Sequence, residues 1–146
     1  MTGLQAPPVV PQNHDLDFWI GTWKVYVEGK LDGTDVVEKV SGGFGVIEKW
    51  KGVEGGTGTS LFYWMPVKHQ WKQVWVTAAG VYKEKFSEPF KGGIRFEGEI
   101  FLPDGRTISD RTTLTRLPKG KVRQVIEFSK DGHTWTVSYD AVYERA

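Results

Sequence analysis

Residues 44–77 read FGVIEKWKGVEGGTGTSLFYWMPVKHQWKQVWVT, and this stretch decides the fold class. Three short strand-like runs lie within it, and a glycine-rich turn and a proline-containing turn separate them. Polar and apolar side chains alternate along these runs, least clearly over 57–65, where Leu61, Tyr63 and Met65 are as apolar as their neighbours. Such alternation is typical of β-strands that have one buried face. Because the turns are too short to contain a crossover helix, consecutive strands must pair antiparallel. The stretch therefore predicts hairpins with an aromatic face, since it contains four tryptophans, Trp50, Trp64, Trp71 and Trp75.

The same pattern extends over most of the chain. Ten strand-like runs are predicted, at residues 22–28, 34–40, 44–50, 57–65, 71–77, 81–86, 94–101, 107–115, 122–128 and 134–143. The intervals between them contain turn-forming combinations of Gly, Asp and Pro, such as LDG at 31–33 and PDG at 103–105. A long antiparallel meander curls, and closure into a barrel removes its exposed edges. We therefore expect an all-β fold, a single antiparallel up-and-down barrel of about eight to ten strands.

The first residues differ from the rest of the chain. Residues 1–12 contain three prolines, Pro7, Pro8 and Pro11, and few side chains that can pack, so we expect a flexible N-terminal arm. Asn13 is expected to cap a short helix over residues 14–20, which Gly21 ends. The predicted organisation is an arm, residues 1–12, followed by one barrel domain, residues 13–146.

Composition excludes several classes of function. The 146 residues include no cysteine, which excludes disulfides, thiolate metal sites and cysteine nucleophiles. The 19 basic and 18 acidic residues give a formal net charge of +1, so electrostatics do not favour nucleic acid or an anionic membrane as a partner. Neither a signal-peptide pattern nor an apolar run of membrane-spanning length is present. We expect a cytoplasmic protein, a monomer or a homodimer, with no nucleic-acid or membrane partner.

A resemblance to known proteins sharpens the expected fold. Residues 17–23, DFWIGTW, resemble the start of lipocalin-like, calycin-type barrels, in which a short helix leads into a Gly-x-Trp strand. The chain is further similar to the bacterial DUF1579-type lipocalin-like proteins in the segments IEKW at 47–50, QWKQVWV at 70–76, PKGKVRQ at 118–124 and SKDGHTW at 129–135. The resemblance implies a lipocalin-like barrel with Trp23 closing its base and with an internal pocket, and it implies no particular reaction.

The haem-binding nitrobindins share this barrel type, and they offer a test for a cofactor. They carry a longer glycine pattern at their start than residues 21–27 supply, and they need an axial histidine near the C-terminus. Here the late histidine, His133, falls in a predicted hairpin turn outside the barrel wall. We therefore expect no haem and no other cofactor. The three histidines, His14, His69 and His133, also lack metal-ligand spacing, so no metal site is predicted.

Glu48 is the most informative single residue. The alternation places it on an apolar face between Val46 and Trp50, where an unpaired carboxylate is costly to bury. One interpretation is a ligand-orienting group or a general acid or base, which makes Glu48 the candidate catalytic residue. The alternative is an internal salt bridge, with Arg111 or Arg123 as the partner.

Other predicted inward residues complete a candidate site. Gln73 and Gln124 can each donate and accept hydrogen bonds, either to a ligand or to each other and buried water. Asp110 is a third possible inward polar group. The predicted ligand-binding set is Glu48, Trp50, Trp64, Gln73, Trp75, Gln124 and Tyr139. Trp23 and Trp135 are expected to be plain core, and Val137 shares the predicted inward face of Trp135.

Three hypotheses for the function follow. The first is a binding protein that holds a small, largely apolar molecule, such as an aromatic or polyketide-like compound, inside the barrel. The second is a cofactor-free enzyme of the cyclase or isomerase type, which would use acid–base chemistry in the same cavity. The third is an interaction protein whose barrel is filled by side chains.

Overall fold

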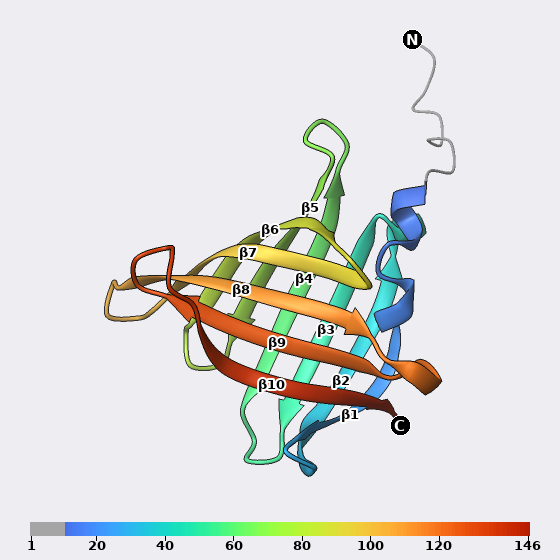
Figure 1. Cartoon of the computed structure of the whole chain (residues 1–146), viewed down its shortest axis with the longest axis horizontal. Helices are drawn as coiled ribbons and strands as arrows, with labels where there is room; N and C mark the ends of the chain where they lie inside the picture. The colour runs from blue at the N-terminus through green and yellow to red at the C-terminus, as the bar shows by residue number, and fades with distance from the viewer. Residues whose placement is uncertain (1–10) are drawn as a thin grey trace.

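Ten antiparallel strands close into one barrel (Figure 1). The structure is a computed structural model, and it describes residues 11–146. The strands are β1 Gly21–Val27, β2 Lys30–Val40, β3 Gly45–Gly52, β4 Thr57–Met65, β5 Gln70–Thr77, β6 Tyr82–Phe90, β7 Gly93–Phe101, β8 Thr107–Arg116, β9 Val122–Ser129 and β10 Thr136–Arg145. The all-β, up-and-down barrel predicted from the alternation is thus confirmed.

The barrel closes because its first and last strands pair. β1 pairs with β10 from Trp23 opposite Arg145 to Tyr26 opposite Val142, and it pairs with β2 on its other edge. Each remaining strand pairs with the next one along the chain. Closure leaves no unpaired edge along the sheet, which removes the principal aggregation hazard of a long meander.

The short N-terminal helix that the sequence predicts is confirmed, and it consists of two short 3₁₀ helices. η1 Pro11–His14 and η2 Asp17–Trp19 lie over one end of the barrel (Figure 1). Two more one-turn helices, η3 Ser41–Gly43 and η4 Pro118–Gly120, connect strands at the same end. The prediction that Asn13 caps a helix is wrong: Asn13 lies inside η1, and its amide donates a hydrogen bond to the Gly42 carbonyl at 3.3 Å. No helix within residues 11–146 is long and apolar enough to cross a membrane.

The predicted arm is largely outside the described residues, since these begin at Pro11. Gln12, its last residue, belongs to η1, and its carbonyl accepts a hydrogen bond from the Asp15 backbone at 3.2 Å. The division into an arm and a barrel domain therefore stays a prediction.

An apolar core fills the half of the barrel beneath η1 and η2, which we call the closed half. Trp23 is fully buried there, and its indole N–H donates to the Trp19 carbonyl at 2.8 Å, as expected for a tryptophan that closes the base. The Trp19 ring packs edge-on against Phe62, with centroids 5.3 Å apart. The buried apolar side chains are Leu16, Trp19, Trp23, Val25, Val37, Val46, Phe62, Trp71, Ile94, Phe96, Leu114, Val122, Ala141 and Tyr143.

A bulge in β10 reverses the predicted inward orientation of the residues that precede it. The pairing with β9 shifts by one residue between Val137 and Tyr139, so Val137 turns outward and is 55% exposed. Trp135 lies before the strand begins, and the Arg111 guanidinium sits over its ring at 4.1 Å. The predictions that Trp135 and Val137 face the interior are therefore wrong, because the inserted residue changes the parity of everything before it.

Candidate functional site

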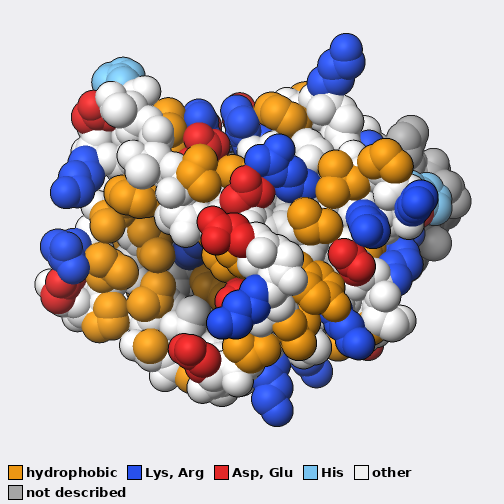
Figure 2. All heavy atoms as spheres, turned by 60° about the horizontal axis from the view of Figure 1, so that its bottom comes forward, with side chains coloured by type: hydrophobic (Ala, Val, Ile, Leu, Met, Phe, Trp, Pro, Cys, Tyr) orange, Lys and Arg blue, Asp and Glu red, His pale blue; other side chains and the backbone are white. Residues whose placement is uncertain are grey.

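The other half of the barrel interior, which we call the open half, contains a cavity of about 290 Å³. Figure 2 looks toward this end of the molecule and shows a hollow with basic and hydrophobic side chains inside it. The cavity is lined by Asp32, Glu48, Trp50, Gln73, Trp75, Lys83, Lys85, Thr112, Gln124, Ile126, Ser138, Tyr139 and Tyr143. Its volume is near the lower limit of small-molecule pockets, which suits a compact ligand better than a long chain.

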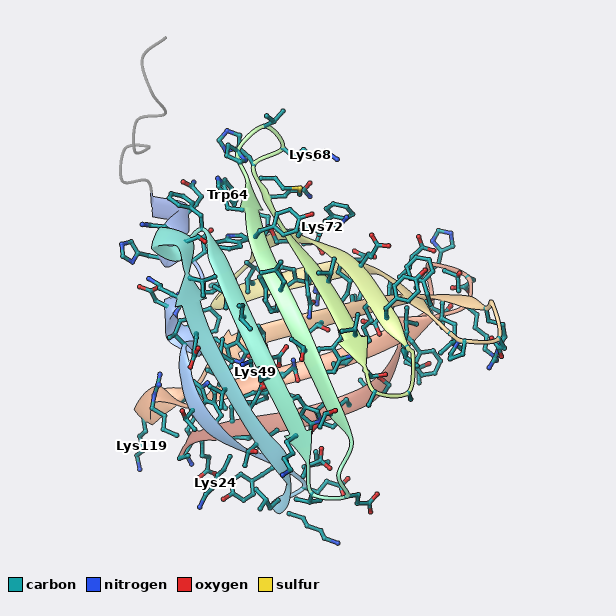
Figure 3. The ribbon with its side chains drawn as sticks, turned by 180° about the vertical axis from the view of Figure 1, so that it is seen from behind. Lys24, Lys49, Trp64, Lys68, Lys72 and Lys119 are labelled. Atoms are coloured by element: carbon teal, nitrogen blue, oxygen red, sulfur yellow. The ribbon has the colours of Figure 1, made fainter. Side chains whose placement is uncertain are left out.

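The structure brings together all but one member of the predicted ligand-binding set. The residues that line the cavity are Glu48, Trp50, Gln73, Trp75, Gln124 and Tyr139. Trp64 lies instead at the closed half, beside the β4–β5 turn, where its ring packs against Trp71 and His69 (Figure 3). Trp64 therefore does not share a continuous space with Trp50 and Trp75. Whether the others bind a ligand stays a prediction.

Two glycines make room for the tryptophans of the cavity. A Cβ added to Gly33 would lie 2.5 Å from the Trp50 ring, and one added to Gly58 would lie 2.2 Å from the Trp75 ring. Both distances are shorter than van der Waals contact, so only glycine fits at these positions. The two indole rings therefore lie across the neighbouring strands as fixed apolar walls.

A hydrogen-bonded series of three side chains crosses the inner wall from β3 to β5. Ser60 donates to a carboxyl oxygen of Glu48 at 2.8 Å, and the amide nitrogen of Gln73 donates to the Ser60 hydroxyl at 3.1 Å. The amide oxygen of Gln73 is buried and has no hydrogen-bond partner in the described part of the chain. Gln73 is only 7% exposed, so this oxygen carries the cost of a buried polar atom without a hydrogen bond.

Glu48 faces the interior, as its parity predicts, and it is 5% exposed. The alternative of a salt bridge to Arg111 or Arg123 is wrong. Arg111 pairs with Glu127 at 2.9 Å, and Arg123 pairs with Asp140 at 2.7 Å. Each arginine lies between two inward-facing residues of its strand. Both arginines therefore face outward and point away from Glu48.

Asp35 forms a second buried carboxyl group beside Glu48. Its side chain is inaccessible to solvent, and neither carboxyl oxygen has a hydrogen-bond partner within residues 11–146. Burial raises the pKa of Asp35 far above its usual range, and the neighbouring Glu48 carboxyl raises it further. Two adjacent carboxyl groups in an apolar wall cannot both be ionised, so this pair retains a proton at neutral pH.

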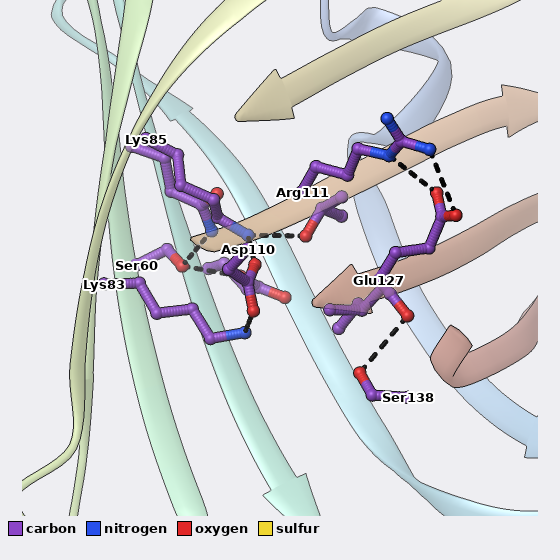
Figure 4. Close-up of polar contacts among 11 residues, drawn as sticks. Ser60, Lys83, Lys85, Asp110, Arg111, Glu127 and Ser138 are labelled. Carbon is purple, nitrogen blue, oxygen red and sulfur yellow. Dashed lines mark hydrogen bonds and ion pairs between the residues drawn. The ribbon is translucent and has the colours of Figure 1, made fainter. Parts of the chain in front are cut away.

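An ion cluster spans β6 and β8, next to β5 along the sheet (Figure 4). Lys85 donates to Asp110 at 2.7 Å and also to the Thr112 hydroxyl, and Lys83 approaches the other Asp110 oxygen at 3.0 Å. Burial, followed by the charge of Lys83, lowers the pKa of Lys85 to about 8. Burial opposes the ionisation of Asp110, but the two lysines outweigh it and hold the pKa of Asp110 below its usual value.

Gly98 on β7 makes this cluster possible. It lies opposite Lys85 on one edge and opposite Asp110 on the other, so it separates the two charged residues across the sheet. A Cβ added to Gly98 would lie 2.0 Å from the Glu84 carbonyl oxygen. Because no side chain stands between them, Lys85 extends over β7 and reaches the carboxylate on β8.

Two tyrosines complete the polar lining. The Tyr139 hydroxyl donates to Asp32, and the Tyr143 hydroxyl donates to the side-chain oxygen of Gln124 at 3.0 Å. Burial raises the pKa of both tyrosines above the usual value, so both remain neutral donors at physiological pH. Gln124 is thus held by Tyr143, and not by Gln73.

Sequence reasoning missed Asp35, Lys83 and Lys85. The alternation gave a signal for Asp35, which lies two residues before the inward Val37 on the same strand. For Lys83 and Lys85 the pattern pointed the other way, because lysines at alternate positions normally indicate a solvated face. Asp110, identified as a possible inward group, does face inward and is 3% exposed.

The described residues contain no group of three or more His, Asp or Glu side chains placed to hold a metal ion. His133 is exposed in the β9–β10 turn, where its backbone N–H donates to Asp131 at 2.7 Å. The cavity therefore offers hydrogen-bonding groups, an ion cluster, a protonated carboxyl pair and aromatic walls to whatever occupies it.

No protein-family model matches the chain, and no curated protein matches it either. The closed ten-strand antiparallel barrel is consistent with a calycin-like fold. Membership of the DUF1579-type group remains an expectation from the resemblance.

Proposed function

We propose that this protein binds a small, compact molecule in the open half of its barrel, with an apolar ring system and at least one polar group. The observation that supports this most directly is the cavity itself, whose walls combine Trp50 and Trp75 with the unpartnered amide oxygen of Gln73. Aromatic walls stabilise a ring by desolvation and stacking, and a few fixed polar groups determine its orientation. The cavity argues against an interaction protein with a filled barrel.

A pair of ring compounds tests this proposal. 2-Naphthol has a hydroxyl that can donate to the Gln73 oxygen, whereas naphthalene has the same ring system without it. We expect 2-naphthol to quench tryptophan fluorescence with an affinity about tenfold higher than naphthalene, the effect of one hydrogen bond of about 1.4 kcal/mol. If neither compound binds, the proposal is contradicted.

A matched pair of variants locates the binding. Gln73→Met keeps a similar volume and removes the amide, so it should abolish the preference for 2-naphthol over naphthalene. Lys72→Met changes the adjacent residue of β5, which faces outward and pairs with Glu84 at 3.2 Å, and it should leave the preference intact. Native mass spectrometry of the purified protein, searching for a retained molecule, would then identify the natural ligand.

A cofactor-free enzyme is the second candidate, and the Asp35–Glu48 pair favours it. A carboxyl group that keeps its proton at neutral pH can act as a general acid on a molecule in the cavity. The test is incorporation of solvent deuterium into a retained ligand. Glu48→Gln should abolish this exchange and leave the ligand bound if the pair transfers the proton.

A further inference from the structure

Lys85 is the one lysine among residues 11–146 whose side chain is fully withdrawn from solvent, at 1% exposure. Burying an ammonium group is costly unless it is fully paired. Here the pairing is incomplete, because Lys85 and Lys83 share the single carboxylate of Asp110 at 2.7 and 3.0 Å. Lys85 therefore lies in the cavity wall beside a second cation that shares its carboxylate partner, with Glu48 as a further acidic group nearby.

This arrangement is one that activates an amine. A lysine becomes nucleophilic when it loses its proton, and desolvation next to another cationic group is a recognised way to achieve this. The groups that surround Lys85 are Lys83 on its own strand, Gln73 opposite it on β5, Glu48 on β3, and Asp110 and Thr112 on β8. With the pKa of Lys85 lowered to about 8, about a tenth of its side chains are neutral at pH 7.

We propose that Lys85 is a nucleophilic amine and that the cavity takes small aromatic aldehydes or ketones, which form an imine with its Nζ. This inference rests on the proposed binding of a compact ring molecule in the same cavity. Trp75 lies opposite Lys83 across the β5–β6 pair, two residue pairs from Lys85 and therefore on the same face, so a ring held against Trp75 projects its substituent toward the amine. Lys83 and the Thr112 hydroxyl provide hydrogen-bond donors for the carbonyl oxygen.

The reaction balances without an oxidant or a reductant. The lone pair of the neutral Nζ attacks the carbonyl carbon, and as the C–N bond forms one proton moves from the nitrogen to the oxygen. The resulting carbinolamine loses its hydroxyl group together with the remaining N–H proton as water, which leaves a C=N bond. The imine then takes back the proton that the ammonium group had released. The iminium form retains the positive charge of the original ammonium group, so Asp110 remains its counter-ion and the charge of the cluster is unchanged.

Reductive trapping tests the inference on the full chain. Benzaldehyde with sodium cyanoborohydride at pH 7 converts an imine into a stable benzyl-lysine, which intact mass and peptide mapping detect. A pKa of about 8 against the ordinary 10.5 gives Lys85 a roughly 300-fold larger neutral fraction than an exposed lysine. We therefore expect Lys85 to be labelled at least about tenfold faster than any other lysine, with a rate that levels off above pH 8.

Variants separate the amine from its surroundings. Lys85→Met should abolish the fast labelling, and Lys72→Met on the outer face of the same sheet should leave it unchanged. If Lys85→Met fails to fold, Lys85→Arg serves instead, because it keeps the positive charge beside Asp110 and cannot form the adduct. Labelling spread evenly over the lysines, or equal labelling of the wild type and Lys85→Arg, would overturn the inference.

Benzyl alcohol distinguishes this inference from the proposed function. It has the same ring and no carbonyl group, so its binding reports on the cavity alone through tryptophan fluorescence. Binding of benzyl alcohol without an adduct at Lys85 would defeat the amine chemistry and leave the binding proposal standing. Absence of binding as well as of the adduct would defeat both.

Discussion

The closed and open halves of the barrel interior are built from the same strands, yet they differ in chemistry. The closed half packs aromatic and aliphatic side chains such as Phe62, Phe96 and Leu114. The open half buries Asp35, Glu48, Lys85 and Asp110. Apolar burial stabilises the fold, whereas buried charges rarely do so. One end of this barrel therefore supplies the stability that allows the other end to contain groups that are costly to bury.

The largest expected effect is the loss of a core aromatic ring. Phe96 is inaccessible to solvent and packs edge-on against Phe62 with centroids 5.2 Å apart. We expect Phe96→Ala to lower the free energy of unfolding by about 3–5 kcal/mol. Trp75→Ala, in the partly buried wall of the cavity, should cost about 1 kcal/mol. Urea denaturation measures both, and equal losses would show that the two halves contribute alike.

Breaking the ion cluster should have the next largest effect. Asp110→Asn leaves two lysines without a counter-ion, and we expect a loss of about 3 kcal/mol or more at pH 7. The control is Asp140→Asn, which breaks the exposed pair with Arg123 and should cost less than about 1 kcal/mol.

The pH dependence provides an independent check on Asp110. Its pKa is lower in the folded protein than the ordinary 3.8, so its stabilising contribution is present above that value. The contribution is lost as the pH falls through the folded-state pKa. The stability difference between the wild type and Asp110→Asn should therefore narrow below about pH 4. A constant difference would show that Asp110 acts by shape alone.

Much of this fold was predictable because its signals are local. Residues 57–65 and 107–115 differ by at most one residue from β4 and β8, since alternation and turn residues act within a few positions. β2 begins at Lys30, four residues earlier than predicted, because pairing with β1 extends the strand through a bulge at the LDG turn. Such pairing is a property of the partner strand and has no signal within the segment itself.

The candidate site was predictable only in part, for a similar reason. Parity within one strand correctly turned Glu48 and Gln73 inward. Parity does not say how far along the barrel axis a side chain lies, and so Trp64 was grouped with Trp50 although it lies at the other end. The burial of Lys85 depends on Asp110, which lies two strands away across Gly98. That contact exists only after the sheet has closed.

Asp35→Asn is expected to raise the free energy of unfolding by a moderate amount, whereas the preceding substitutions lower it. The folded-state pKa of Asp35 is raised, so the folded protein holds a proton that the unfolded chain releases above its ordinary value of 3.8. The stability that this group contributes is therefore complete below about pH 4 and is lost as the pH rises. Asparagine resembles the protonated form and does not titrate. We expect the variant to match the wild type near pH 4 and to exceed it by about 1–3 kcal/mol at pH 8.

Denaturation at a series of pH values measures this difference. The decisive feature is its slope, since a simple packing change would shift the two curves by the same amount at every pH. A variant that is less stable than the wild type at pH 8 would contradict a protonated Asp35.

The smallest change in stability is expected for Glu48→Gln. This substitution therefore separates the open half from the closed half by its effect on the free energy of unfolding. Glutamine keeps the shape and the hydrogen bond from Ser60, and it removes a carboxyl group from beside Asp35. Truncation of a closed-half side chain is expected to cost stability, whereas here we expect the free energy of unfolding to stay within about 1 kcal/mol of the wild type or to rise. Binding of 2-naphthol should be retained over the same change, because glutamine preserves the hydrogen-bonded series through Ser60 that orients Gln73. The control is Glu38→Gln, an exposed outward residue of β2, which should alter neither quantity. A loss of about 3 kcal/mol or more would instead identify Glu48 as one partner of a structural ion pair, and the open half would then be part of the stabilising core.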